Sequence, residues 1–142
     1  MDKIAGITLT PLKRIEHEKG DILHGMKRSE ATFSGFGEAY FSTVIKNEIK
    51  AWKCHRKMVL NLIVPAGAVK FVVKDLNTQN PDTTFETILS KENYCRLTIQ
   101  PGLWFGFMGI GEELNLVCNI ASIEHNPNEV GRKELHEIAH EW

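Results

Sequence analysis

The sequence has no excess of charge of one sign. Its 17 Lys and Arg residues are balanced by 18 Asp and Glu residues, which leaves a formal net charge of −1. No overall cationic field is therefore available to attract nucleic-acid phosphates or anionic lipid. We expect neither nucleic acid nor a membrane surface as a partner.

Cysteines and long apolar runs are also scarce. Cys54, Cys95 and Cys118 are an odd number of cysteines without a CxxC pair, which argues against a disulfide framework and a cysteine zinc site. No segment approaches the roughly 18 consecutive apolar residues of a membrane helix, and the first residues do not resemble a secretory signal. These absences predict a soluble, cytoplasmic protein.

The sequence does contain a series of short apolar or alternating segments that are separated by turn residues. Over 142 residues of ordinary globular composition, such a series is typical of one all-β domain, residues 1–142. The expected strands are 36–45, 58–64, 68–73, 83–89, 95–99, 103–107 and 114–123, with a loop at 77–82. Pro65-Ala66-Gly67 predicts a tight hairpin turn between the second and third strands. Only 129–142 has an apolar spacing that is loosely helical.

The sharpest motif match lies near the C-terminus. His136-Glu137-Ile138-Ala139-His140 has the H-E-x-x-H form that, on a helix, places two zinc-binding imidazoles on one face. A zinc protease needs a third ligand, and the sequence ends two residues later. We therefore interpret the motif as a charged surface segment and predict no metal site.

A second candidate is the basic segment Trp52-Lys53-Cys54-His55-Arg56-Lys57, between two predicted strands. An imidazole can act as a base at neutral pH, and Lys53 and Arg56 offer positive charge to an anionic substrate. Cys54 and His55 are adjacent, so on a strand they point to opposite faces and do not form a nucleophile–base pair. The pattern alone leaves both a solvated loop and a catalytic His55 open.

Several segments then follow one another in a familiar order. They are Phe36-Gly37-Glu38-Ala39-Tyr40-Phe41-Ser42, Lys53-Cys54-His55, the stretch 67–76, Leu89-Ser90-Lys91-Glu92-Asn93, the stretch 97–107, Asn126-Pro127 and Glu141-Trp142. Together they resemble the dTDP-4-dehydrorhamnose 3,5-epimerase family, including its LSxEN, LxIPxGxxHGF and IEW segments. The resemblance extends over about Gly20 to Trp142.

The resemblance implies a fold and a reaction. The fold is a cupin, a double-stranded β-helix that forms a jelly-roll-like antiparallel barrel, and the protein is expected to be a homodimer. The reaction is an epimerisation or isomerisation next to the keto group of a nucleotide-linked 4-keto-6-deoxy sugar, without metal or organic cofactor. It serves the biosynthesis of deoxysugars and surface polysaccharides such as lipopolysaccharide. A keto group acidifies the adjacent C–H bonds, so one base in the pocket can form an enolate.

The resemblance also implies site residues. His55 matches the family's base, the His of an RGLH segment, and Tyr40 is the expected acid from a neighbouring strand. Lys53 and Arg56 are expected to hold phosphate. The other expected substrate-binding residues are His24 at the pocket mouth, Trp104 as an aromatic wall, and Asn119 near the position of the family's pocket Tyr.

Departures from the family pattern leave other functions open. Phe105 replaces the His of HGF, Trp52 replaces the Arg of RGLH, and the Asp that pairs with the base lies beyond IEW, where this sequence ends. The residues considered as replacements for this Asp are Glu38, Asp75 and Glu124. The alternatives to an epimerase are a 3,4-ketoisomerase and a sugar-nucleotide-binding cupin without catalysis. A metal-dependent cupin is disfavoured because His55 has no second His two residues away.

Overall fold

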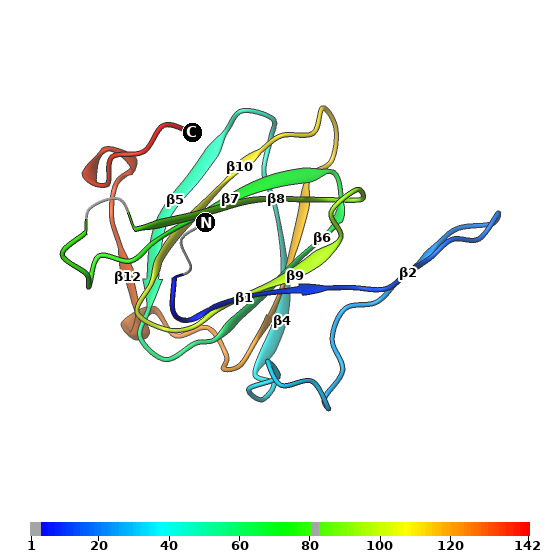
Figure 1. Cartoon of the computed structure of the whole chain (residues 1–142), viewed down its shortest axis with the longest axis horizontal. Coiled ribbons are helices and arrows are strands. Elements are labelled where there is room, and N and C mark those ends of the chain that lie inside the picture. Colours follow the sequence, from blue (N-terminus) through cyan, green and yellow to red (C-terminus); the bar gives the residue numbers. More distant parts are fainter. Residues whose placement is uncertain (1–3, 81–82) are drawn as a thin grey trace.

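The computed structural model describes residues 4–80 and 83–142, which form two five-stranded antiparallel sheets and a separate two-stranded hairpin (Figure 1). The first sheet has the order β1-β9-β6-β11-β4 and the second has the order β12-β5-β10-β7-β8. The strands of the first sheet are β1 (Ile7–Pro11), β9 (Cys95–Ile99), β6 (Leu60–Ala66), β11 (Leu116–Ala121) and β4 (Glu38–Thr43). Those of the second are β12 (Val130–Arg132), β5 (Ile49–His55), β10 (Trp104–Gly109), β7 (Ala68–Lys74) and β8 (Thr84–Ser90). The hairpin consists of β2 (Arg14–Ile15) and β3 (Ile22–Leu23).

The core lies between the two sheets and arises from the two-residue alternation of each strand. On β7, Val69, Phe71 and Val73 are fully buried and belong to one apolar cluster with Leu97 and Ile99 of β9. Transfer of each such side chain from water to the core stabilises the folded state by about 1.5–3 kcal/mol. The antiparallel barrel confirms the predicted all-β cupin fold, and each of the seven predicted strands is present. The strands β1, β5 and β12 were not predicted, and Trp52–His55, which was expected between two strands, forms the end of β5.

The predicted hairpin at Pro65-Ala66-Gly67 is wrong. β6 and β7 are consecutive, but they belong to different sheets, and β7 pairs instead with β8. At the crossing, Gly67 has a φ of 82°, and a Cβ there would lie 2.2 Å from the carbonyl oxygen of Leu114. The turn residues therefore mark a corner of the barrel, where only glycine fits. Of the loop predicted at 77–82, residues 81–82 lie outside the described residues.

The helical interpretation of 129–142 is also wrong. This segment follows a 3₁₀ turn at Pro127–Glu129, adds β12 to the edge of β5, and forms a second 3₁₀ turn at Leu135–Glu137. The H-E-x-x-H motif thus lies on no α-helix, and His140 Nε2 lies 2.8 Å from Glu86 Oε2 of β8. The described part of the chain contains no group of three or more His, Cys, Asp or Glu side chains arranged for a metal ion.

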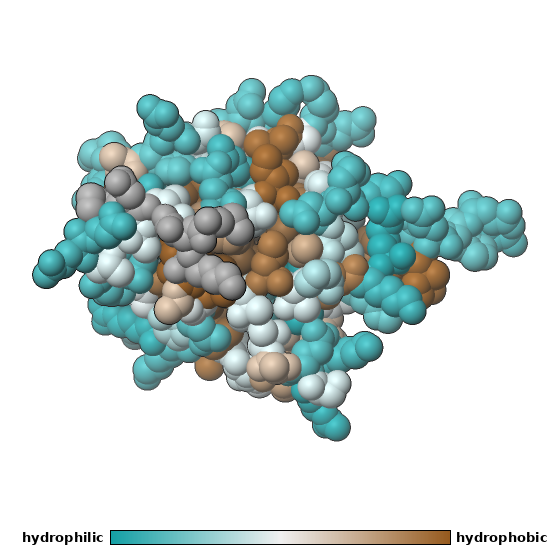
Figure 2. Space-filling view, viewed as in Figure 1, coloured by the Kyte–Doolittle hydropathy of each residue, from teal (hydrophilic) through white to brown (hydrophobic). Residues whose placement is uncertain are grey.

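The β2–β3 hairpin projects away from the barrel (Figure 1). Its apolar side chains are accessible, and Ile22 is 57% exposed. Figure 2 shows this arm as a protrusion that carries both polar and apolar side chains. Among the described residues, no helix is long and apolar enough to cross a membrane.

Candidate active site

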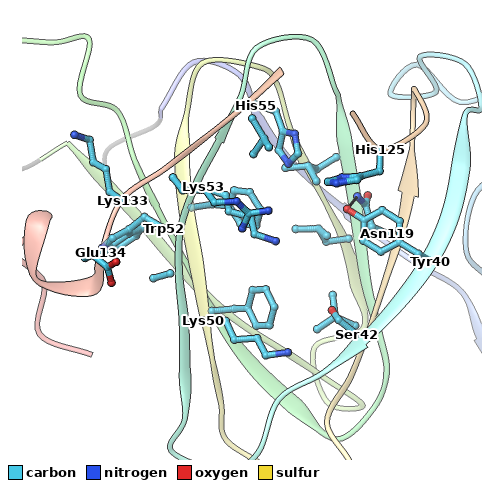
Figure 3. A pocket seen from close by; sticks show the side chains of 18 of the residues that line it. Tyr40, Ser42, Lys50, Trp52, Lys53, His55, Asn119, His125, Lys133 and Glu134 are labelled. Carbon is cyan, nitrogen blue, oxygen red and sulfur yellow. Dashed lines mark hydrogen bonds between the residues drawn. The ribbon is translucent and has the colours of Figure 1, made fainter. Parts of the chain in front are cut away.

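A cavity of about 520 Å³ lies between the two sheets and contains His55 (Figure 3). One wall comes from β4, β6 and β11, and contributes Tyr40, Leu62 and Asn119. The other comes from β5, β10 and β12. This volume is within the range of small-molecule sites, and the walls combine apolar surface with a few polar groups, as such sites do.

The sequence of β5 directs several polar side chains into this cavity. Lys53 and His55 are two residues apart, so the strand alternation places both on the cavity side. On β10, Phe105 pairs with Lys53 and Phe107 pairs with Lys50, while Trp52 has no partner on β10 because it lies at a bulge. This extra residue brings Lys50 back to the face that Lys53 and His55 occupy.

His55 is held by a buried carboxylate. His55 Nδ1 lies 2.5 Å from Glu129 Oε2, and the two side chains are only 5% and 3% exposed. The second oxygen, Oε1, accepts hydrogen bonds from the backbone N–H groups of Lys57 and Met58, both at 2.9 Å. A carboxylate accepts the Nδ1 proton, which assigns the tautomer and leaves Nε2 as the basic atom. The arrangement is that of an oriented general base.

The charge of Glu129 is stabilised by its hydrogen bonds. Burial by itself raises the pKa of this carboxyl, but the hydrogen bonds from His55, Met58 and Lys57 outweigh burial and hold the pKa below its ordinary value. Glu129 is therefore ionised at neutral pH. An ionised partner stabilises the positive charge that His55 acquires when it takes a proton.

Glu129 holds His55 where the family pattern has an Asp beyond the IEW segment. The three residues considered for this role do not hold His55: Glu38 Oε1 accepts from the backbone of His125, Asp75 Oδ1 accepts from the backbone of Asn77, and Glu124 is absent from the cavity wall. Glu129 is 74 residues from His55 in sequence. Its only sequence signal is its place in the turn that starts at Pro127, beside the Asn126-Pro127 segment.

The opposite wall positions a phenol. Asn119 Nδ2 donates to Tyr40 Oη at 2.9 Å, while Asn119 Oδ1 accepts from the backbone N–H of Asn61 at 3.0 Å. The second bond fixes the orientation of the amide, so Tyr40 receives a hydrogen bond and keeps its own O–H for another acceptor. Tyr40 thus presents a proton donor to the cavity from the wall opposite His55 (Figure 3).

Positive side chains outnumber the acidic residues of the same cavity, which are Glu134 and Glu137. Lys53 and Arg132 are paired residues of β5 and β12, and both line the cavity with Lys50 and Lys133. Desolvation, followed by the charges of Arg132 and Lys50, lowers the pKa of Lys53 below its ordinary value. Lys50 Nζ donates to the carbonyl oxygen of Thr43 at 2.7 Å. This concentration of positive charge suits an anionic ligand.

The structure does not bring all predicted residues to this cavity. Arg56 is exposed beyond the end of β5, and Trp104 lies outside the lining, with Lys133 Nζ 5.2 Å from its ring centre. His24 lines a separate hollow beside Glu30, and its carbonyl oxygen accepts from Tyr94 Oη. Cys54 is also outside the cavity lining, and burial raises the pKa of its thiol, which disfavours the nucleophilic thiolate.

An antiparallel barrel whose inner cavity carries an oriented base, a phenol and cations is a cupin equipped for acid–base chemistry. No protein-family model matches the chain. The crystal structure of a dTDP-sugar isomerase from Desulfovibrio desulfuricans G20 is 33% identical, with a TM-score of 0.90 over 98% of this chain and 92% of that one. The chain therefore belongs to the family of dTDP-sugar isomerases and dTDP-4-dehydrorhamnose 3,5-epimerases, as the resemblance indicates.

The chain also has more distant similarities to known proteins. The spore coat polysaccharide biosynthesis protein SpsL of Bacillus subtilis (strain 168) is 24% identical over 135 residues, which cover 93% of this chain and 89% of that protein. The dTDP-4-dehydrorhamnose 3,5-epimerase of Sulfolobus tokodaii has a TM-score of 0.82 at 20% identity, covering 98% of this chain and 83% of that one. QdtA, a sugar 3,4-ketoisomerase of Thermoanaerobacterium thermosaccharolyticum in complex with TDP, has a TM-score of 0.77 at 21% identity, covering 96% and 94%. The last two show the shared fold.

Proposed function

We propose that this protein is an epimerase or isomerase that removes a proton next to the keto group of a dTDP-linked 4-keto-6-deoxy sugar. The observation that carries the proposal is the buried His55–Glu129 pair, which faces the phenol of Tyr40 across one cavity. Proton abstraction and return on opposite faces of a sugar ring require two such groups on opposite walls.

The reaction follows from this placement. Nε2 of His55 takes the proton of the carbon beside the ketone, and the C–H electron pair forms an enolate whose charge rests on the keto oxygen. The excess of positive side chains around the cavity favours this negative charge. Tyr40 then gives its O–H proton to the carbon from the other face, which inverts the centre and restores the ketone.

The nucleotide is assigned to the cationic side of the cavity. Lys53 and Arg132 are neighbours across β5 and β12, and such a pair suits the charge of a diphosphate. Arg56, which was expected to help, is not among the cavity residues. The dTDP-sugar isomerase relative and the TDP bound to QdtA support this choice of ligand.

We further propose a place in polysaccharide biosynthesis and a homodimeric assembly. The first is supported by the name of SpsL. The second is supported by the projecting β2–β3 hairpin, whose Ile15, Ile22 and Leu23 are exposed in the single chain. A dimer mass in light scattering supports the assembly, and a monomer mass contradicts it. The cytoplasmic location stays a prediction.

Product analysis tests the proposed function. Purified protein is incubated with dTDP-4-keto-6-deoxyglucose in D₂O, and the sugar is followed by NMR at C3, C4 and C5. Inversion with deuterium at C3, C5 or both identifies an epimerase, and a carbonyl moved to C3 identifies a 3,4-ketoisomerase. If dTDP binds but no deuterium enters the sugar, the proposal is wrong and the protein is a binding cupin.

A further inference from the structure

His125 is a second imidazole at the cavity, and the proposed reaction has not yet used it. It follows β11 and lines the cavity on the side that carries Tyr40 and Asn119. Figure 3 shows its ring turned toward the cavity, between His55 and the Asn119–Tyr40 pair. The cavity therefore has an imidazole on each side.

The backbone that carries His125 is fixed at several points. Its own N–H donates to Glu38 Oε1 at 2.9 Å, and Ser122 Oγ accepts from the N–H of Val59 at 2.8 Å. The 3₁₀ turn Pro127–Glu129 follows at once and ends on the residue that holds His55. The ring itself makes no hydrogen bond or ion pair with any residue in 4–80 or 83–142. His125 thus combines a fixed backbone with an imidazole that is available to a ligand.

We propose that His125 is a second proton donor of this site and touches the substrate on the face opposite His55. A protonated imidazole carries ring N–H groups that can give a proton to a reacting carbon, as general acid catalysis requires. A ring N–H bond of His125 breaks, and its proton joins the enolate carbon. The electron pair of the C=C bond forms the new C–H bond, and the ketone is restored. The ring of His125 is then neutral and regains a proton from water, because this residue is exposed.

Two proton donors on one wall, Tyr40 and His125, suit a substrate that has an acidic C–H bond on each side of its ketone. Tyr40 is held by Asn119 on the adjacent strand, whereas His125 comes from the segment after that strand, so the two donors reach different places in the cavity. A 4-keto sugar has acidic C–H bonds on both sides of its ketone. The inference rests on the proposed function, since His125 acts on the enolate that His55 makes.

The test separates proton removal from proton delivery. His125→Asn is compared with the unsubstituted protein in D₂O, and two quantities are measured: deuterium entering unreacted substrate, and product formed. Without His125, the enolate at the position that His125 serves is protonated again from the His55 side, so deuterium enters there but the configuration is retained, while Tyr40 still serves the other position. We expect product formation to fall at least about tenfold while deuterium uptake by the substrate continues. His136→Asn, an exposed histidine outside the cavity, is the matched control and should leave both rates unchanged.

Three results overturn the inference. The first is product formation by His125→Asn at the unsubstituted rate. The second is an equal fall of product and deuterium uptake, which indicates a structural or binding role. The third is no deuterium uptake by the unsubstituted protein, which refutes the proposed function itself and is thereby distinguished from the other two. If His125→Asn does not fold by circular dichroism, His125→Gln is measured by the same criteria.

Discussion

Replacement of Glu129 by Gln tests how the base is oriented. The amide keeps the size of the carboxylate, and its oxygen can still accept from the backbone of Lys57 and Met58. Its NH₂ group then faces His55 Nδ1, where the carboxylate lies 2.5 Å away in the native protein. Because an NH₂ group donates, Nδ1 must become the acceptor and the proton moves to Nε2. The atom that should take the substrate proton is then blocked.

The expected losses can be estimated from these contacts. Loss of general-base catalysis lowers kcat by about 10²–10⁴-fold. The change also replaces one charge-assisted hydrogen bond in a buried site, which lowers the free energy of unfolding by about 1.5–3 kcal/mol. The assays are deuterium exchange into the substrate and urea denaturation, with Glu124→Gln as control because Glu124 does not line the cavity. A Glu129→Gln protein with kcat within about threefold of the unsubstituted value would refute the reasoning.

Three further predictions follow from other contacts. Tyr40→Phe removes the donor held by Asn119 and should lower product formation by about 10²-fold or more, with unchanged dTDP affinity by calorimetry; a fall in affinity alone would contradict the assigned role. Arg96→Met removes a fully buried guanidinium that binds Gly25 O and Glu30, and should cost about 3 kcal/mol in urea denaturation; a loss below about 0.5 kcal/mol would count against these contacts. Burial, aided by Lys74, lowers the pKa of His140, so the unfolded chain binds its proton at higher pH than the folded one. The stability that neutral His140 provides is fully present above the ordinary histidine pKa and is lost as the pH falls below it. Between about pH 7 and pH 5.5, the free energy of unfolding should therefore fall less for His140→Gln than for the unsubstituted protein. An equal fall in both proteins would show that His140 does not contribute.

The sequence predicts the strands well because their alternation is local. The segment 95–99 matches β9 at both ends. β5 was missed because its charged residues look like a loop, although Cys54 and His55 do lie on opposite faces, as adjacent residues of a strand must. Which strands pair with one another depends instead on contacts between residues that are far apart in the sequence. Pro65-Ala66-Gly67 has the composition of a hairpin turn, yet the close approach to Leu114 makes it a corner between two sheets.

The residues of the site also fall into those that the sequence predicts and those that only the fold reveals. His55 and Tyr40 could be predicted from the sequence because they lie within segments that resemble the family, and both line the cavity. Glu129 and His125 come from one irregular segment that no periodicity describes, and only the fold brings it beside β5. The helical interpretation of this region failed because its apolar residues serve different neighbours: Val130 pairs with His55, whereas Ile138 packs with Trp52.

The central claim is that His55 removes a proton from the carbon beside the ketone. The most direct measurement is the rate at which deuterium from D₂O enters dTDP-4-keto-6-deoxyglucose, for the unsubstituted protein and for His55→Asn, with dTDP binding measured on both. We predict exchange at C3, C5 or both by the unsubstituted protein, and its loss in His55→Asn while dTDP still binds. Exchange that persists in His55→Asn at the unsubstituted rate would contradict the assignment of the base.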